Sequence, residues 1–278
     1  MDNARLAEII ADIYATAPGL TVSEQDAMRP DLAGLRIFDE PFFGVAAADD
    51  PIFTEYKKPG IIGPWHSMPS DWVPGAKSVV SVVFPFTEEV KASNRKEIFQ
   101  GSMEWMHARF EGQTYQNIFM TELERRLRAE DVTCHIPMLD GGFRSFNKGK
   151  DLEQYDWTDE HTYSSNWSER HAAYAAGLGS FALTRAFITK KGVAVRFSSV
   201  ITDAGFTPTE RTCTGVYDYC IRCGACAHRC PAHAISLEGG KEHAPCSTHA
   251  NATMRGHRYG CGMCQTAVPC ESGIPERK

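Results

Sequence analysis

The stretch that decides the fold near the carboxyl end is Cys220-Ile221-Arg222-Cys223-Gly224-Ala225-Cys226-Ala227-His228-Arg229-Cys230-Pro231. Its cysteines are separated by two, two and three residues and a proline follows, which is the spacing of bacterial ferredoxins. Three thiolates this close together bind three irons of one cubane, while the fourth points toward a neighbouring cluster. Zinc is the competing interpretation, but zinc sites usually use two separated pairs of ligands. The run therefore predicts a [4Fe-4S] cluster.

A second set of cysteines completes the pattern: Cys246, Cys261, Cys264 and Cys270. Ferredoxins share ligands crosswise, which assigns Cys220, Cys223, Cys226 and Cys270 to a first cluster and Cys230, Cys246, Cys261 and Cys264 to a second. Cys270 is the least regular member, because five residues separate it from Cys264 where three are usual; Cys213 is the alternative. Two adjacent clusters predict a short electron relay, and the alternative is a purely structural pair.

The composition of the whole chain is that of an ordinary globular protein, of which the cysteine-rich module is one part. The chain has 278 residues, 42% of them hydrophobic and 23% charged, and nine of its ten cysteines follow residue 212. We expect a large domain over residues 1–205 and a ferredoxin-like domain over residues 206–278. The formal net charge of -6 gives no basic excess for nucleic acid. The amino end has no signal-like segment, and the apolar run Val79 to Phe86 is too short to span a membrane, so we expect a cytoplasmic protein.

Helical and strand patterns are mixed along the large domain, which predicts an α+β or α/β fold. Within residues 1–75, a first helix ends near residue 16 and an irregular region rich in proline and glycine follows. The remaining expected elements are a buried strand at Lys77 to Phe84, a helix at Ser102 to Glu130, a helix capped by Ser168, and strands at Phe187 to Thr189 and Val193 to Ile201, joined by a turn.

Several of these segments together resemble the epoxyqueuosine reductase and reductive dehalogenase superfamily over roughly residues 70–270. The sixteen-residue step from Cys230 to Cys246 and the lead-in Tyr259-Gly260-Cys261 resemble the module of that superfamily. Glu169-Arg170 followed by an Ala-rich helix and Gly177-Leu178-Gly179 resembles a segment of its large domain, and Val193 to Asp203 resembles the strand after it.

The resemblance implies a flavin-reductase-like (nitroreductase-like) three-layer core that holds a corrinoid, cobalamin, beside one cluster. The residues it places at the cofactor are Glu169, Arg170, Gly177 and Gly179. It also implies that a ferredoxin or flavodoxin supplies electrons, which the clusters relay to the corrinoid. Because the same core binds flavin in other families, a flavin-dependent reductase is an alternative. Another is an electron-transfer or activator protein that docks a corrinoid protein.

Two departures from the family pattern bear on the substrate. Epoxyqueuosine reductase has an acidic proton donor six residues before the Glu-Arg pair, where this chain has Tyr163. Reductive dehalogenases use a tyrosine, so we expect Tyr163 to be the catalytic acid, with Arg144 or Lys148 lowering its pKa; a tyrosine packed in a loop is the alternative. The helical-repeat region that grips tRNA is missing from this sequence, so we expect a small-molecule substrate rather than tRNA.

Overall fold

The computed structural model describes residues 1–146 and 164–277. Its helices are α1 (Asn3–Thr16), α2 (Ile52–Glu55), α3 (Pro69–Trp72), α4 (Glu88–Arg95), α5 (Met103–Ala129), α6 (Glu169–Ala175), α7 (Ala225–His228) and α8 (His243–Ala252), with 3-10 turns η1 (Pro30–Leu32), η2 (Pro137–Leu139) and η4 (Met263–Gln265). Its strands are β1 (Phe42–Ala47), β2 (Ser78–Pro85), β3 (Cys134–His135), β4 (Ser145–Phe146), β5 (Ser164–Ser165), β6 (Gly179–Phe181), β7 (Phe187–Thr189), β8 (Val195–Thr202), β9 (Ile235–Ser236) and β10 (Gly240–Lys241).

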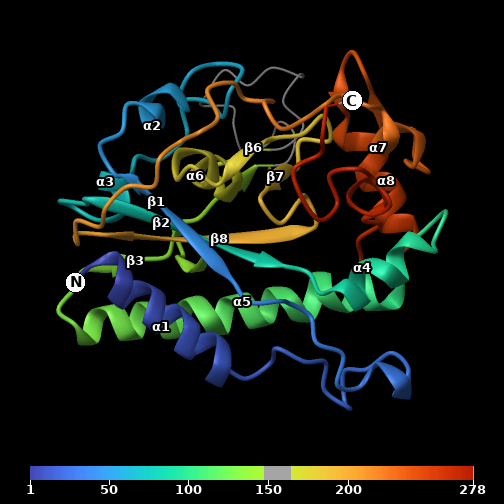
Figure 1. The fold of residues 1–278 in the computed structure, drawn as a ribbon, viewed down its shortest axis with the longest axis horizontal. Helices are drawn as coiled ribbons and strands as arrows, with labels where there is room; N and C mark the ends of the chain where they lie inside the picture. Colours follow the sequence, from blue (N-terminus) through green and yellow to red (C-terminus); the bar gives the residue numbers. More distant parts are fainter. Residues whose placement is uncertain (147–163, 278) are drawn as a thin grey trace.

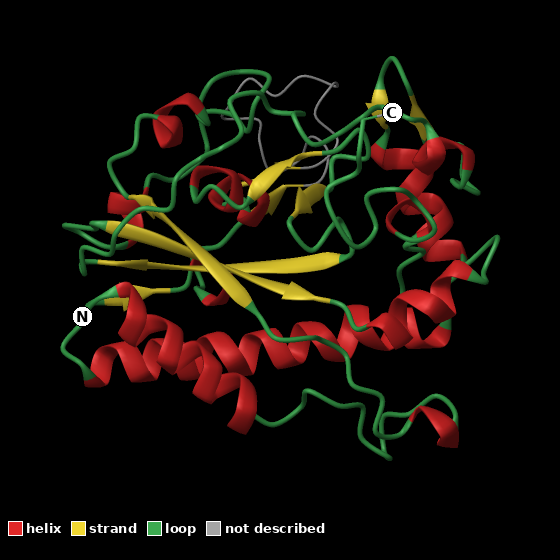
Figure 2. Ribbon diagram, viewed as in Figure 1, coloured by secondary structure: helices red, strands yellow, loops and turns green. Residues whose placement is uncertain are grey.

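The central sheet has the strand order β1-β2-β8-β3, and each neighbouring pair is antiparallel. In its register Val45 lies opposite Val80, and Ser81 lies opposite Ser199. Side chains alternate along a strand, so β2 sends Val80 and its even-numbered neighbours to one face and the odd-numbered ones to the other. Both faces are covered by helices (Figures 1 and 2), which explains why every residue of β2 is buried. The core is therefore a three-layer α/β/α arrangement.

One face of the sheet packs against α1 and α5. Each of these helices begins at a side-chain cap: Asp2 accepts from the amide of Arg5 at 2.9 Å, and Ser102 accepts from that of Trp105 at 3.1 Å. Phe119 on α5 meets Phe84 of β2 edge to face, with ring centroids 5.1 Å apart. The expected helices at residues 1–16 and at Ser102 to Glu130 are therefore present with nearly the predicted bounds.

The opposite face packs against α6, the β6–β7 hairpin and the short helix α2. Trp167 is buried just before α6, and its indole donates to the Ser199 hydroxyl of β8 at 2.9 Å. Ser168 is the N-cap residue of α6, as predicted, although its hydroxyl bonds to the Nδ1 of His171 and not to a backbone amide. The strands expected at residues 187–189 and 193–201 exist, but β7 pairs with β6 and β8 pairs with β2.

Strand β1 corrects the expectation that residues 1–75 are irregular beyond the first helix. It forms one edge of the sheet, and the glycine at its centre concealed it from the sequence pattern. A Cβ on Gly44 would lie 2.4 Å from the carbonyl oxygen of Ala176, at the end of α6. Glycine is needed there because α6 lies directly against the strand.

The C-terminal segment contains α7, α8 and η4, and it lies at the end of the core where α4 and α5 meet (Figure 1). The domain boundary near residue 205 stays a prediction. None of the helices in the described residues is long and apolar enough to cross a lipid bilayer.

Candidate iron-sulfur site

The first predicted ligand group lines one pocket at the edge of the C-terminal segment. Cys220, Cys223, Cys226 and Cys270 contribute to its wall together with apolar residues of the β6–β7 region, such as Ala182 and Ile188. Burial, together with the neighbouring cysteines, raises the pKa of Cys226 to about 11 and that of Cys270 to about 12. Thiols this close to one another and this far from water need cations to ionise them, which the irons of a cluster provide.

The second predicted group forms beside it from Cys230, Cys246, Cys261 and Cys264. Burial is the main reason that the pKa of Cys261 rises to about 12, and the other three cysteines of the group raise it as well. The pKa of Cys264 is raised for the same reasons, with Cys246 and Cys230 as its cysteine neighbours. Cys226 of the first group is influenced by Cys264 of the second, so the two groups adjoin.

The arrangement of the thiols suits cubanes. All ten cysteines are free, and among the described residues no three His, Cys, Asp or Glu side chains are placed to share a single metal ion. A cubane binds its thiolates through four different irons and therefore holds them further apart than one zinc ion does. The donor set thus fits two [4Fe-4S] clusters, and the ligand assignment itself stays a prediction.

Close backbone contacts hold the second group against α5. Gly262 has φ +66°, and a Cβ on it would lie 2.1 Å from Trp105 Cε2. A Cβ on Gly101, just before α5, would lie 2.2 Å from the carbonyl oxygen of Gly260. Glycine at 262 therefore serves the docking of this loop on Trp105 as well as its turn.

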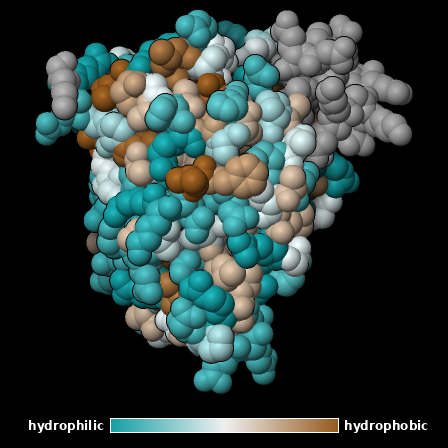
Figure 3. Space-filling view, turned by 90° about the vertical axis from the view of Figure 1, so that its right-hand side faces the viewer, coloured by the Kyte–Doolittle hydropathy of each residue, from teal (hydrophilic) through white to brown (hydrophobic). Residues whose placement is uncertain are grey.

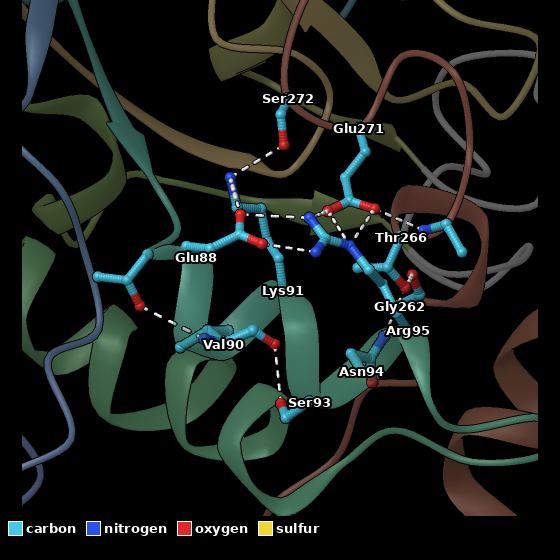
Figure 4. A network of polar contacts seen from close by, with 12 residues as sticks. Glu88, Val90, Lys91, Ser93, Asn94, Arg95, Gly262, Thr266, Glu271 and Ser272 are labelled. Carbon is cyan, nitrogen blue, oxygen red and sulfur yellow. Dashed lines mark hydrogen bonds and ion pairs between the residues drawn. The ribbon is translucent and has the colours of Figure 1, made fainter.

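Helix α4 binds both cysteine loops through a polar network (Figure 4). Asn94 donates to the Thr266 hydroxyl at 2.9 Å and to the carbonyl of Cys261 at 3.3 Å. Arg95 donates through Nε to both carboxylate oxygens of Glu271, at 2.8 and 3.0 Å, and this glutamate directly follows Cys270. A single helix of the large domain therefore fixes the positions of both groups.

Cys270 is also tied to the strand region of the large domain. The amide of Val193 donates to the carbonyl of Cys270 at 2.8 Å, and that of Ala194 donates to the carbonyl of Glu271 at 3.2 Å. These amides immediately precede β8. The chain between Cys264 and Cys270 is longer than is usual in ferredoxins, and Cys270, which ends it, is hydrogen-bonded to the backbone that leads into β8.

The two remaining cysteines lie outside both groups. Cys213 neighbours Tyr174 and Tyr219 and lines a different cavity, of about 540 Å³, between β1 and α6. Cys134 is buried in the core, and burial raises its pKa to about 11. The structure thus brings Cys270, and not Cys213, to Cys220, Cys223 and Cys226.

The residues that we expected to contact a cofactor in the large domain differ in burial. Glu169 begins α6, and both of its carboxylate oxygens are buried without a hydrogen-bond partner among the described residues. Burial raises the pKa of Glu169 to about 7, and the Ser199 hydroxyl opposes this rise only in part. Arg170 is exposed beside it. Tyr163 and Lys148 lie outside the described residues.

Gly177 and Gly179 have packing reasons of their own. Both have positive φ, +69° and +151°. A Cβ on Gly177 would lie 2.7 Å from the carbonyl oxygen of Glu210, and one on Gly179 would lie 1.9 Å from that of Ile188. The close approach of neighbouring backbone thus explains both glycines without a cofactor contact.

One charged residue was missed by the sequence reasoning. Arg196 lies on β8 and faces α5, where its Nε donates to Gln116 Oε1 at 2.9 Å and its Nη2 donates to Gln113 Oε1. Burial, with smaller contributions from the charges of Arg109 and Arg170, lowers the pKa of Arg196 to about 9. The sequence signal that could have indicated this residue is a single arginine in a strand, β8, whose other residues are apolar or carry hydroxyl groups.

Comparisons with known proteins agree with this geometry. A family model described as a 4Fe-4S binding domain matches residues 216–236. No curated protein matches the chain in sequence. Among solved structures, the catabolic reductive dehalogenase NpRdhA is similar, with a TM-score of 0.53 and 15% identity over 84% of this chain and 30% of that chain.

Two further solved structures complete the comparison. A reductive dehalogenase structure described in terms of B12-dependent dehalogenation matches with a TM-score of 0.53 and 15% identity, over 84% of this chain and 30% of that chain. The epoxyqueuosine reductase of Bacillus subtilis matches with a TM-score of 0.48 and 18% identity, over 86% of this chain and 63% of that chain. This chain thus spans under a third of the length of the dehalogenases. It has the fold that reductive dehalogenases contain and carries a 4Fe-4S binding domain at residues 216–236.

Proposed function

We propose that this protein is a cobalamin-dependent reductase of a small molecule, in which two [4Fe-4S] clusters pass electrons from a ferredoxin or flavodoxin to a corrinoid in the large domain. The observation that carries this proposal is the gathering of eight thiols into two adjoining groups held by one helix of the large domain. A purely structural metal would need only one such group.

The exposure of the cysteines gives the relay a direction. Cys223 is exposed, whereas all members of the second group are buried or half-buried. Exposed apolar side chains occur in the same segments, among them Val216, Tyr217 and Leu237. The face of the molecule on this side shows apolar patches among hydrophilic residues (Figure 3). An electron-donor protein therefore has access to the first group, and the second group passes electrons inward.

The large domain has unsatisfied polar groups suited to a corrinoid. Residues 195–199 of β8 have no partner strand on the side away from β2 within the described residues. Glu169 lies near Ser199 on the α6 face of this stretch, and Arg196 lies on the α5 face. A buried carboxyl group that lacks a full set of hydrogen bonds is costly, so it fits a site whose ligand brings hydrogen-bonding groups. Glu169 and Arg170 would contact the amide side chains that surround a corrin ring.

Chemistry at the bound corrinoid would be divided between cofactor and protein. The corrinoid supplies the cobalt that gives electrons to the substrate. The protein supplies position and a proton, which we assign to the Tyr163 hydroxyl on the basis of the sequence. Tyr163→Phe should abolish turnover but leave the iron content and the corrinoid spectrum intact, whereas unchanged turnover would remove Tyr163 from the mechanism.

Visible absorption of the anaerobic, cluster-loaded protein tests the proposal. Titration with cobalamin should give saturable binding with the spectrum of a corrinoid whose lower base is displaced. If cobalamin does not bind at any concentration, an electron-transfer or activator protein becomes the better account. A flavin spectrum in the purified protein would instead identify a flavin-dependent reductase.

A further inference from the structure

Arg196 is a half-buried cation whose charge no carboxylate of the described residues balances. Its guanidinium donates to two neutral amides, Gln113 and Gln116, and no carboxylate lies within ion-pair distance of it in the described chain. Placing a charge away from water is costly unless an opposite charge or a full set of hydrogen bonds compensates. Two amide oxygens compensate the guanidinium only in part.

The charges around Arg196 make its environment more positive. Arg109 precedes Gln113 by one turn of α5 and so lies on the same helix face as this partner of Arg196. The charges of Arg109 and of Arg170, on α6, both lower the pKa of Arg196. Arg109 lies over the ring of Tyr259, 5.0 Å from its centroid, and forms no ion pair with a described carboxylate. The nearby Glu111 does not supply the balance, because it pairs with Arg258 and His107.

This cationic site adjoins the second cysteine group. Tyr259 is two residues before Cys261, and a Cβ on the intervening Gly260 would lie 3.0 Å from Arg109 Cγ. The site also lies where β8 has no partner strand along residues 195–199 in the part of the chain that the structure describes. A ligand there would sit next to the inner end of the proposed relay.

We propose that Arg196 and Arg109 form an anion site that binds the phosphate of the electron-accepting cofactor. The inference deepens the proposed function, since it names the part of the cofactor that this site recognises. Guanidinium groups bind phosphate oxygens in bidentate fashion, which suits two arginines from different elements better than it suits one neutral group. Cobalamin carries a phosphodiester in its nucleotide loop, and flavin mononucleotide carries a phosphate monoester.

Paired ligands with and without phosphate test the inference on the cluster-loaded protein. Equilibrium binding is measured for cobalamin and for cobinamide, which lacks the nucleotide loop, and for flavin mononucleotide and riboflavin. The wild-type protein should prefer the phosphate-bearing member of the bound pair by at least about tenfold. Arg196→Gln and Arg109→Gln should bring that ratio close to one and leave the affinity for cobinamide or riboflavin unchanged. Arg125→Gln, at an exposed arginine of the same helix, is the matched control and should keep the wild-type ratio.

The outcomes separate this inference from the proposed function. Preference for flavin mononucleotide without any cobalamin binding would overturn the corrinoid proposal and support the phosphate site. Equal affinity for both members of each pair in the wild type would overturn the phosphate site, even if corrinoid binding is tight. Binding of neither pair by the wild type would also overturn it. If Arg196→Gln fails to fold, Arg109→Gln alone decides, and a wild-type affinity ratio in that variant would contradict the inference. Inorganic phosphate that competes with the phosphate-bearing ligand equally in the wild type and in both variants would also contradict it.

Discussion

The guanidinium of Arg95 and the carboxylate of Glu271 pair across 176 residues of sequence, and they join α4 to the segment that follows Cys270. The Glu271 side chain is only 7% exposed, and its second oxygen also accepts from the amide of Ala267 at 2.5 Å. Glu88 flanks Arg95 on the outer side. The pair therefore anchors a cluster loop from a helix of the large domain.

Removal of Arg95 should leave the Glu271 carboxylate buried without its cation. We expect Arg95→Met to lower the free energy of unfolding by about 2–3 kcal/mol, since breaking a buried pair costs more than losing a surface one. Urea unfolding of the cluster-loaded protein, followed by circular dichroism and by the visible cluster absorption, measures this loss. Arg125→Met, at an exposed ion pair on α5, is the control and should have little effect. Equal midpoints for the two variants would show that the buried pair does not anchor the loop.

Alanine substitutions at two glycines with similar backbone conformations distinguish the cost of lost packing against α5 from the cost of a strained turn. Gly262 and Gly256 have φ of +66° and +60°, but a Cβ would meet Trp105 only at Gly262, and nothing lies within 4 Å of one at Gly256. Both alanine variants carry the strain of a left-handed residue, about 1–2 kcal/mol. Gly262→Ala should lose a further 1–3 kcal/mol or so through overpacking against Trp105. Equal urea midpoints for the two variants would argue against close docking on α5.

Much of this fold could be predicted from the sequence, and the misses have physical causes. The buried strand β2 followed from its run of β-branched residues, which ends at Pro85, and the long helix α5 followed from its apolar periodicity. Both are features of the local sequence. Strand β1 was missed because Gly44 is required by contact with α6, a tertiary constraint that no local pattern reveals. Arg196 was missed because its significance depends on Arg109 and Gln116 from a distant helix.

The buried carboxyl of Glu169 predicts a stability that falls as pH rises. Its pKa is about 7 in the folded protein against an ordinary 4.5, so the folded state keeps a proton that the unfolded state loses. Stability should therefore decrease between about pH 4.5 and pH 7, by roughly 3 kcal/mol if the whole difference is expressed. Glu169→Gln removes this dependence. The variant should be more stable than the wild type at pH 8 and nearly equal at pH 5 in corrinoid-free urea unfolding, and a constant difference across that range would contradict a buried neutral carboxyl.

Cysteine variants distinguish the two candidates for the least regular ligand. Cys270→Ser should lower the bound iron toward about half or destabilise the module, because Cys270 lies with Cys220 and Cys223 in one pocket. Cys213→Ser should keep the wild-type iron content, because Cys213 lies beside Tyr174 and Tyr219. Iron analysis after anaerobic reconstitution measures both. The reverse pattern would replace Cys270 by Cys213 in the first group.

The total metal content of the protein tests the central claim most directly. Anaerobic protein reconstituted with iron and sulfide should contain about eight irons and eight sulfides per chain, with the Mössbauer spectrum of [4Fe-4S] clusters. A preparation that holds zinc, or no more than about four irons per chain, would contradict the two-cluster relay.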